Sequence, residues 1–254
     1  SSILSKKLAE GIDALVLDVK VGRGAFMKSE ADARELARSL VRVGKLSGKR
    51  VSALLTDMSS PLGLTIGNAL ETVEALELLH GGGPEDLREV TLALGSEMLR
   101  AAGVARSTAQ AERQLDRAVR EGAAAKKMSE IVKAQGGDPR VVEEPDRLKP
   151  ARYRVTVAAT KRGFVTGIDP LELGYASMGL GAGRTRAEEP VDPGAGIRLH
   201  AQLGDEVRAG DPLATLYSSR RPLLQPGAAR TLAAFELGRR PRALPSRVIG
   251  TIRR

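Results

Sequence analysis

The sequence contains no cysteine and no tryptophan, and aromatic residues make up only 2% of its 254 positions. Without cysteine the chain has no disulfides, no thiolate metal ligands and no cysteine nucleophile, and it fits a cytoplasmic location. The scarcity of aromatic residues leaves few platforms for stacking single-stranded bases. His80 and His200, the two histidines, lie far apart in the sequence, which argues against a zinc site or a histidine-based nucleophile.

Long apolar runs are also missing. The run ALVLDV at 14–19 is interrupted by charge within a few residues, whereas a membrane span needs about 20 apolar residues. The opening SSIL offers neither the charged nor the apolar region of an export signal, and no initiator methionine precedes it. We therefore expect a cytoplasmic protein that does not span a membrane, with further sequence upstream of Ser1.

The net charge is +9 with a pI of about 10.1, which raises the possibility of a nucleic-acid partner. Basic residues alternate with acidic ones through most of the chain, however, and the local excess lies near the C-terminus. We expect no binding to nucleic acid. A small anionic substrate is compatible with this charge.

The first part of the chain has the pattern of a βαβ unit. Buried strands are expected at 14–20 and 50–57, and a helix at 29–44 lies between them. Ser29 is the expected N-cap of this helix, and Asp32 resembles the second member of a capping box. A right-handed crossover makes the two strands parallel. After a loop at 58–67, we expect helices at 68–80, 84–103, 108–121 and 123–135.

The composition changes after residue 136. The stretch 136–152 is rich in glycine, proline and charge and is expected to be a linker crossing the surface. Beyond it the pattern predicts an α+β domain. Its expected strands are 153–159, 163–168, 196–202, 211–218 and 246–252, and its expected helices are 169–181 and 227–238.

Within this domain, GDEVRAGDPL at 204–213 resembles the hairpin of biotinyl and lipoyl carriers. Carriers present a modifiable lysine at such a turn, and no lysine lies near this one. Gly204, Asp205, Gly210 and Asp211 are therefore interpreted as turn formers. The predicted fold class is α/β, a βαβ sheet core with helices, followed by an α+β C-terminal domain with a barrel-sandwich-like hairpin.

The first residues predict a short helix that ends near Gly11. Ser2 and Lys6 are four residues apart, so they share one helix face. From spacing alone, this face is an ordinary solvated surface as readily as a ligand contact.

Three segments together resemble the pyrimidine-nucleoside phosphorylases, close relatives of thymidine phosphorylase. They are SSILSKKLAEG, LDVKVGRGAFMKS and TDMSSPLGLTIGNALETVEAL, in this order along the chain. The resemblance implies that the chain is the C-terminal part of such an enzyme. Its parts would be residues 1–11 from a small α domain, a portion of the central α/β domain at 12–136, a linker at 137–152 and the C-terminal α+β domain at 153–254.

The resemblance implies reversible phosphorolysis: phosphate attacks the anomeric carbon of a pyrimidine nucleoside and releases the base and a pentose 1-phosphate. Negative charge spreads into the departing base, so donors aimed at it stabilise the transition state more than the ground state. By resemblance Ser2 and Lys6 are these donors, and the Lys6 ammonium matches the developing charge. Phosphate-binding residues would all precede Ser1, and the isolated chain is expected to be inactive.

Phe26, in GRGAF, resembles the apolar wall over the pyrimidine ring. Its alternative role is that of a core or hinge residue, because an aromatic side chain buries well anywhere. Gly22 and Gly24 bend the same loop and could turn their amides toward an anion. Asp18 and Asp57 end the two strands, where open sheets hold ligands, although simple capping is the alternative.

Leu62, Thr65 and Glu74 resemble a cation site of the bacterial enzymes, in which two backbone carbonyls and a carboxylate are ligands. Oxygen ligands of this kind suit potassium or calcium in a structural role. The alternative for Glu74 is a carboxylate on the helix surface.

Other functions remain open at this point. They are a thymidine-specific phosphorylase, a non-catalytic scaffold or carrier-like module, and the related AMP phosphorylases and anthranilate phosphoribosyltransferases. GAF at 24–26 favours a pyrimidine base over the last two. The resemblance also implies a homodimer, and it leaves the choice between uridine and thymidine undecided.

Overall fold

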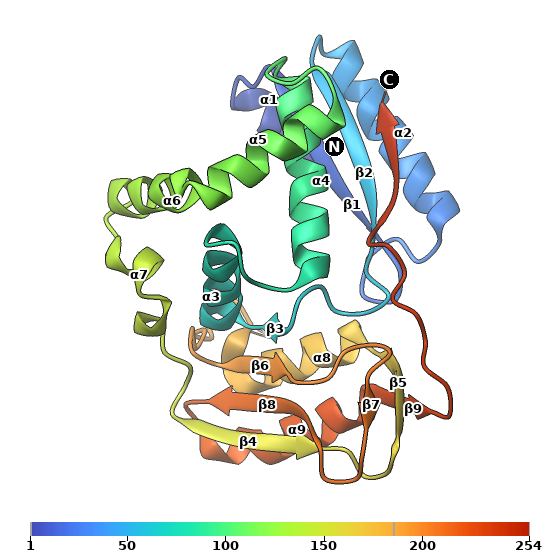
Figure 1. Cartoon of the computed structure of the whole chain (residues 1–254), viewed down its shortest axis with the longest axis vertical. Helices are drawn as coiled ribbons and strands as arrows, with labels where there is room; N and C mark the ends of the chain where they lie inside the picture. The colour runs from blue at the N-terminus through green and yellow to red at the C-terminus, as the bar shows by residue number, and fades with distance from the viewer. Residues whose placement is uncertain (1, 185, 254) are drawn as a thin grey trace. The chain divides into compact units, whose positions relative to one another are not determined.

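The computed structural model describes residues 2–184 and 186–253 and contains both helices and sheets, which confirms the expected fold class (Figure 1). The chain forms two compact units that interleave along the sequence. Unit 1 consists of Ser1–Ser59, Glu85–Glu121 and Ser246–Arg254, and unit 2 of Ser60–Pro84 and Gly122–Pro245. These limits differ from the ranges inferred from the sequence, because segments distant along the chain complete each unit.

The sheet of unit 1 has the order β1-β2-β10, with β1 at Ala14–Val21, β2 at Arg50–Asp57 and β10 at Val248–Arg253. β1 and β2 are parallel from Ala14 opposite Arg50 onward, as the βαβ pattern predicts. Between them lies α2 (Glu30–Leu46), whose N-cap Ser29 accepts a hydrogen bond from the amide of Asp32. The predicted cap is confirmed.

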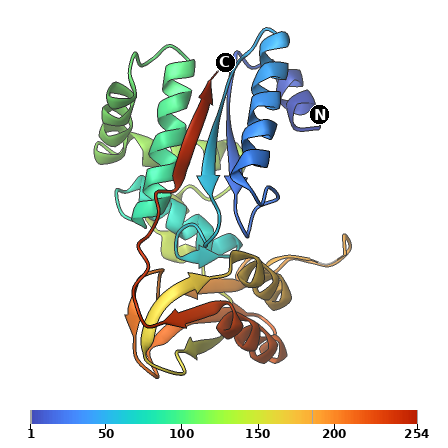
Figure 2. The same cartoon turned by 90° about the vertical axis from the view of Figure 1, so that its right-hand side faces the viewer.

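Helices cover both faces of this sheet (Figure 2). α2 packs its small and β-branched residues Ala33, Ala37 and Val41 against Ala53 and Leu55 of β2. The opposite face carries α4 (Glu85–Ala101), which contacts β1, β2 and β10 and also packs on α5 (Thr108–Arg120). α1 (Ser2–Ala9) precedes β1.

The helical part of unit 2 contains α3 (Asn68–Leu79), α6 (Ala123–Ala134), α7 (Arg140–Glu143) and the 3-10 turn η1 (Pro145–Arg147). The stretch 136–152 is therefore not only a linker. Val142 is fully buried in a cluster with Leu76 and Ala125. Val142, together with the partly buried Val141 and Leu148, anchors this segment in spite of its glycine, proline and charge.

The β part of unit 2 consists of two small sheets. One has the order β3-β6-β8-β4 and the other β7-β5-β9. Their strands are β3 (Thr65–Ile66), β4 (Tyr153–Ala158), β5 (Gly163–Ile168), β6 (Gly196–Leu199), β7 (Glu206–Val207), β8 (Pro212–Ser218) and β9 (Phe235–Gly238). The helical elements are α8 (Pro170–Ser177), α9 (Leu224–Ala233), the π-type turn η2 (Met178–Ala182) and the 3-10 turn η3 (Arg221–Leu223).

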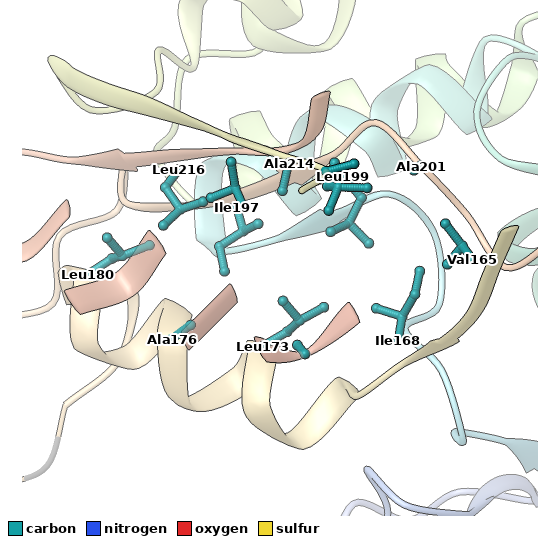
Figure 3. Close-up of a cluster of buried hydrophobic side chains, with 14 of the residues drawn as sticks. Val165, Ile168, Leu173, Ala176, Leu180, Ile197, Leu199, Ala201, Ala214 and Leu216 are labelled. Atoms are coloured by element: carbon teal, nitrogen blue, oxygen red, sulfur yellow. The ribbon is translucent and has the colours of Figure 1, made fainter. Parts of the chain in front are cut away.

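A continuous apolar core joins these sheets to α8 and α9. Figure 3 shows Leu173, Ala176 and Leu180 from the α8–η2 segment facing Ile197 and Leu216 from the sheet. Leu173, Ile197 and Leu216 have no exposed surface. The β-branched and leucine-rich pattern of these strands is explained by this packing.

Three sequence expectations in this region were wrong. Residues 235–238 form strand β9 rather than the end of a helix, because they pair antiparallel with β5. The strand at the C-terminal end, β10, pairs with β2 and belongs to unit 1. In the segment 204–213, β7 pairs with β5 while β8 pairs with β4 and β6, so this segment is not a simple two-stranded hairpin.

The four turn formers in that segment are confirmed. Gly204 and Gly210 have φ of +97° and +94°, in the region that glycine tolerates. The carboxylates of Asp205 and Asp211 accept hydrogen bonds from the amides of Gln202 and Arg208, three residues earlier, at 2.7 Å each.

None of the described helices is long and apolar enough to cross a bilayer.

Candidate functional site

The glycine loop that follows β1 is a tightly hydrogen-bonded turn. Gly22 has φ +122°, and a Cβ there would lie 2.4 Å from the hydroxyl of Ser59. The Gly22 amide donates to the carbonyl of Met27 at 3.0 Å, and the Gly24 amide donates to the carbonyl of Met58 at 2.9 Å. Both amides are therefore engaged within the protein, so the expectation that they face an anion was wrong.

Phe26 lies at the tip of this loop and is 92% exposed. The preceding Ala25 is buried, and the following Met27 forms a bridge with Val21, so both neighbours fix the loop. Phe26 is therefore not a core residue of the described chain. A rigid turn presenting a solvent-exposed aromatic ring is suited to stacking on a planar ligand.

The loop after β2 is fixed by a buried cation that sequence reasoning missed. Arg247 is 3% exposed and pairs with Asp57 at 3.3 Å and with Asp86 of α4 at 2.8 Å. Asp57 thus supports an ion pair, and it also accepts from the amide of Ser59. Arg247 precedes β10, and its sequence neighbourhood contains several exposed arginines, so only the pairing of β10 with β2 reveals its role.

Glu89 continues this network. It accepts hydrogen bonds from the hydroxyl of Ser246 and from the amide of Arg247. Burial alone raises the pKa of Glu89, but the hydrogen bonds from Ser246, Arg247 and Val248 outweigh it and lower the pKa below its ordinary value. Glu89 therefore stays ionised and holds the start of β10.

Asp18 was expected to end its strand, but it lies within β1, three residues before the end, and has a structural role there. Its carboxylate accepts a hydrogen bond from the hydroxyl of Thr56 and forms an ion pair with Lys20 at 2.6 Å. The hydrogen bond from Thr56 ties the two parallel strands together, which is a structural role other than the capping that the sequence suggested.

The predicted base-binding pair lies on α1. Lys6 is exposed, and its ammonium makes no hydrogen bond or ion pair within the described chain. Ser2 begins α1, but its side chain lies outside the described residues. Figure 1 shows α1 near the end of the sheet where β1 begins, whereas the loop with Phe26 follows the other end of β1. The structure therefore does not bring Lys6 and Phe26 together.

The predicted cation ligands lie in unit 2. Glu74 is 5% exposed, so it is not a residue of the helix surface. Its carboxylate accepts from the amide of Leu64 at 2.8 Å and from the hydroxyl of Thr65 at 3.0 Å. Gly63 permits this approach, since a Cβ there would lie 2.4 Å from a carboxylate oxygen. Thr65 and Glu74 are thus brought together, and half-buried Leu62 lies in the same loop.

A small hollow opens beside this loop, with a volume of about 500 Å³ and with Thr65, Glu74 and His200 in its lining. Among the described residues, no group of three histidine or acidic side chains is arranged to hold a metal ion. An ion at this loop would therefore depend on backbone carbonyls in addition to Glu74, as oxygen-rich sites for hard cations do.

The two histidines have structural partners. His80 is the C-cap residue of α3, and its Nε2 lies 2.8 Å from the carbonyl of Val142. His200 lies one residue beyond β6, and its Nε2 lies 2.8 Å from the hydroxyl of Thr215. Burial, together with the charge of Arg198, lowers the pKa of His200 below its ordinary value. Arg184 and Arg186 are exposed, as expected.

Comparison with known proteins identifies both parts of the chain. Residues 1–125 match the model of the glycosyl transferase family a/b domain, and residues 164–237 match the model of the pyrimidine nucleoside phosphorylase C-terminal domain. The second match includes the turn at 204–213, which explains the carrier-like pattern without a carrier lysine.

Curated relatives agree with the two models. The chain is 48% identical over 220 residues to the pyrimidine-nucleoside phosphorylase of Bacillus subtilis (strain 168), and 46% identical over 221 residues to that of Staphylococcus aureus (strain USA300). Each alignment covers 87% of this chain and 51% of the relative. The chain thus spans about half the length of the curated relatives it matches. With both domain models in sequence order and close relatives of one name, the chain belongs to the pyrimidine-nucleoside phosphorylase family.

Proposed function

We propose that the complete protein catalyses the reversible phosphorolysis of pyrimidine nucleosides, with phosphate as co-substrate and with free base and pentose 1-phosphate as products. Both named relatives support this assignment. The structural observation that carries it is Phe26, an almost fully exposed aromatic ring on a loop fixed by its own backbone hydrogen bonds. Because the loop is already fixed, little conformational entropy is lost when the ring stacks on a planar base.

In this proposal Ser2 and Lys6 bind the carbonyl and N3 edge of the base. The Lys6 ammonium has no ionic partner in the described chain, so its charge remains available for a developing anion. An interaction that strengthens as the base accumulates negative charge raises the rate of bond cleavage. Because α1 and Phe26 lie at different ends of β1, a shared site requires α1 to occupy another position in the complete protein. This agrees with the expectation that residues 1–11 belong to a separate helical domain.

The proposal is tested by Lys6→Met in the complete protein, with Lys7→Met as the control. Lys7 is on the same helix but forms an ion pair with Glu10. We expect Lys6→Met to lower kcat/KM for uridine or thymidine by about 100-fold to 1,000-fold, the range for removing one transition-state donor. Unchanged turnover in Lys6→Met, or equal losses in both variants, would contradict the assignment.

We also propose that residues 1–254 alone are inactive, since the expected phosphate contacts lie outside them. Phosphorolysis of uridine by this purified polypeptide would overturn the statement. Whether the complete protein prefers uridine or is thymidine-specific is decided by comparing kcat/KM for the two nucleosides.

We also propose that the protein binds a structural potassium or calcium ion. Its ligands are the carboxylate of Glu74 and the carbonyls of Leu62 and Thr65. What supports it is a buried carboxylate that the amide of Leu64 and the hydroxyl of Thr65 hold against the loop containing Leu62 and Thr65. We expect potassium or calcium to raise the Tm of the complete protein and Glu74→Gln to abolish that increase. An equal increase in the variant would argue against the site.

The dimer proposed next depends on the resemblance, whereas the location and the two absent interactions depend on composition and charge. We propose a cytoplasmic homodimer that binds neither nucleic acid nor membranes. The absence of cysteine fits a reducing compartment. Light scattering of the complete protein tests for the dimer. A nucleic-acid shift assay tests for binding to nucleic acid, and vesicle sedimentation tests for binding to membranes.

A further inference from the structure

Unit 1 contains a cavity of about 510 Å³ at the end of its sheet where β2 begins. Half of its described lining residues are basic: Lys45, Lys49, Arg50, Arg100 and Arg253. Arg50 and Ser52 from the start of β2 line it, whereas the loop with Phe26 follows the opposite end of the parallel strand β1. The described lining of this cavity contains none of the residues proposed to bind the base.

One carboxylate lies among these cations. Glu97 of α4 accepts from Arg100 at 2.8 Å and from Arg253 at 2.9 Å. The hydrogen bond from Arg253 is the main cause that lowers the pKa of Glu97, so this group remains ionised. A single negative charge shared by two guanidinium groups leaves the described lining with a large positive excess.

Ser52 gives the cavity a second, independent feature. Ser52 is 7% exposed, and its hydroxyl has no hydrogen-bond partner among the described residues. A buried hydroxyl without a partner is costly, and buried polar groups in folded proteins nearly always have one. Because Ser52 lines the cavity, a ligand there can supply the missing acceptor.

The position of Ser52 follows from the alternation of β2. Ala53 and Leu55 face α2, so Ser52 faces the other side, where α4 lies. Arg253 is directly opposite Ser52 in the antiparallel pair of β10 and β2. The hydroxyl is thereby placed beside the guanidinium groups rather than in the apolar core.

The chemistry of this lining selects the ligand. Arginine forks, lysine ammonium groups and a serine hydroxyl are all donors to the oxygens of a phosphate group. The remaining walls include Val41, Val51 and Ala101, which are apolar. A volume of about 510 Å³ lies in the range of cavities for small organic ligands, larger than a bare phosphate ion requires.

We propose that this cavity is a second ligand site of the protein, which binds a small organic phosphate with its phosphate group toward Ser52 and the surrounding cations. The apolar wall receives the carbon skeleton of the ligand. Since neither Lys6 nor Phe26 lines the cavity, the ligand is a second effector-type molecule rather than the nucleoside substrate.

The test uses ribose 5-phosphate as the probe and the complete protein. Hydrogen exchange with mass spectrometry measures protection at residues 50–52 and at the C-terminal turn of α4, while calorimetry measures affinity. We expect protection of both segments, and we expect at least tenfold weaker binding of inorganic phosphate than of ribose 5-phosphate.

Two variants and a control test the assigned residues. Ser52→Ala removes the hydroxyl with little change in volume, and Arg50→Met removes an exposed cation that lines the cavity. We expect each to weaken the binding that protects β2 by about tenfold, which corresponds to about 1.4 kcal/mol. Arg113→Met, on the exposed side of α5, is the matched control and should bind like the wild type.

Four outcomes would overturn the proposal. The first is the absence of protection at 50–52, and the second is binding of inorganic phosphate as tight as that of ribose 5-phosphate. The third is wild-type affinity in both Ser52→Ala and Arg50→Met. The fourth is an equal loss in Arg113→Met, which would indicate only a general effect of net charge.

Discussion

Different physical interactions stabilise the interior of each of the two units. In unit 2 a continuous apolar core packs α8 and α9 on two small sheets, with side chains such as Leu173 fully buried. In unit 1 the edge strand β10 is joined to α4 and β2 by a buried arginine network around Arg247. The difference is that apolar packing stabilises a whole layer, whereas an ion network fixes particular groups in position. Asp57, one such group, is followed by Met58, which contacts the glycine loop.

Removal of the buried cation should give the largest effect. Arg247→Met leaves the carboxylates of Asp57 and Asp86 without their buried partner, and breaking such a pair costs about 3–5 kcal/mol. We expect this loss in urea unfolding of the complete protein. Hydrogen exchange should place the loss in unit 1. The control Arg240→Met is exposed and should change stability by less than about 0.5 kcal/mol. Equal stability of the two variants would refute the role of the network.

The second-largest loss of stability is expected from a cavity created in the apolar core. Leu173→Ala removes a fully buried side chain of α8 and should cost about 2–5 kcal/mol. The comparison predicts that this loss appears as faster hydrogen exchange in unit 2. Leu171→Ala, two residues away on the same helix, is the control because Leu171 is exposed. If exchange accelerated equally in unit 1, the two units would not be stabilised separately.

A smaller effect is expected at the glycine loop. Gly22→Ala forces a side chain into a left-handed conformation and against Ser59, which should cost about 1–3 kcal/mol. We also expect weaker base binding, since Phe26 lies on this loop. Gly48→Ala is the control: its φ is +72°, but no atom lies within 4 Å of the added Cβ, so about 1 kcal/mol is expected. Equilibrium unfolding and KM for the nucleoside measure both effects. A KM in Gly22→Ala equal to that of Gly48→Ala would separate the loop from the base site.

The smallest expected effect is a pH dependence in unit 2. The folded-state pKa of His200 is lowered by burial, so below about pH 6.5 the unfolded chain takes up a proton that the folded chain does not. Stability from neutral His200 is therefore complete above this pH and is lost as the pH falls. We expect His200→Gln to reduce the pH dependence of the unfolding free energy between pH 7.5 and 5.5. Identical pH profiles would show that His200 does not contribute.

Local features of unit 1 were predictable from the sequence. β2 has the predicted limits because a continuous apolar run specifies a strand buried on both faces. The cap at Ser29 follows from hydrogen bonding within four residues. In each case the interactions that decide the structure are close in the sequence.

Features that depend on distant segments could not be predicted in this way. The partner of β10 is almost 200 residues earlier in the chain, so its apolar pattern indicated a strand without indicating the sheet. Val142 is one buried residue in a stretch whose overall composition is that of a surface loop.

The candidate site shows the same division. The resemblance singled out Phe26 and Glu74, but only the structure gives the exposure of the first and the burial of the second. Arg247 carried no sequence signal, because burial of an arginine is decided by acidic partners from other elements. The proposed base-binding role of Ser2 and Lys6 comes from the resemblance.

The pairing of β10 with β2 sets an order on the biosynthesis of this protein. Residues 248–253 leave the ribosome only after every segment of unit 2 has been translated. Unit 2 can therefore complete its core while β1 and β2 still wait for their third strand. Until then the edge of β2 offers unpaired backbone groups to other nascent chains, so chaperone protection during translation matters most for the sheet of unit 1.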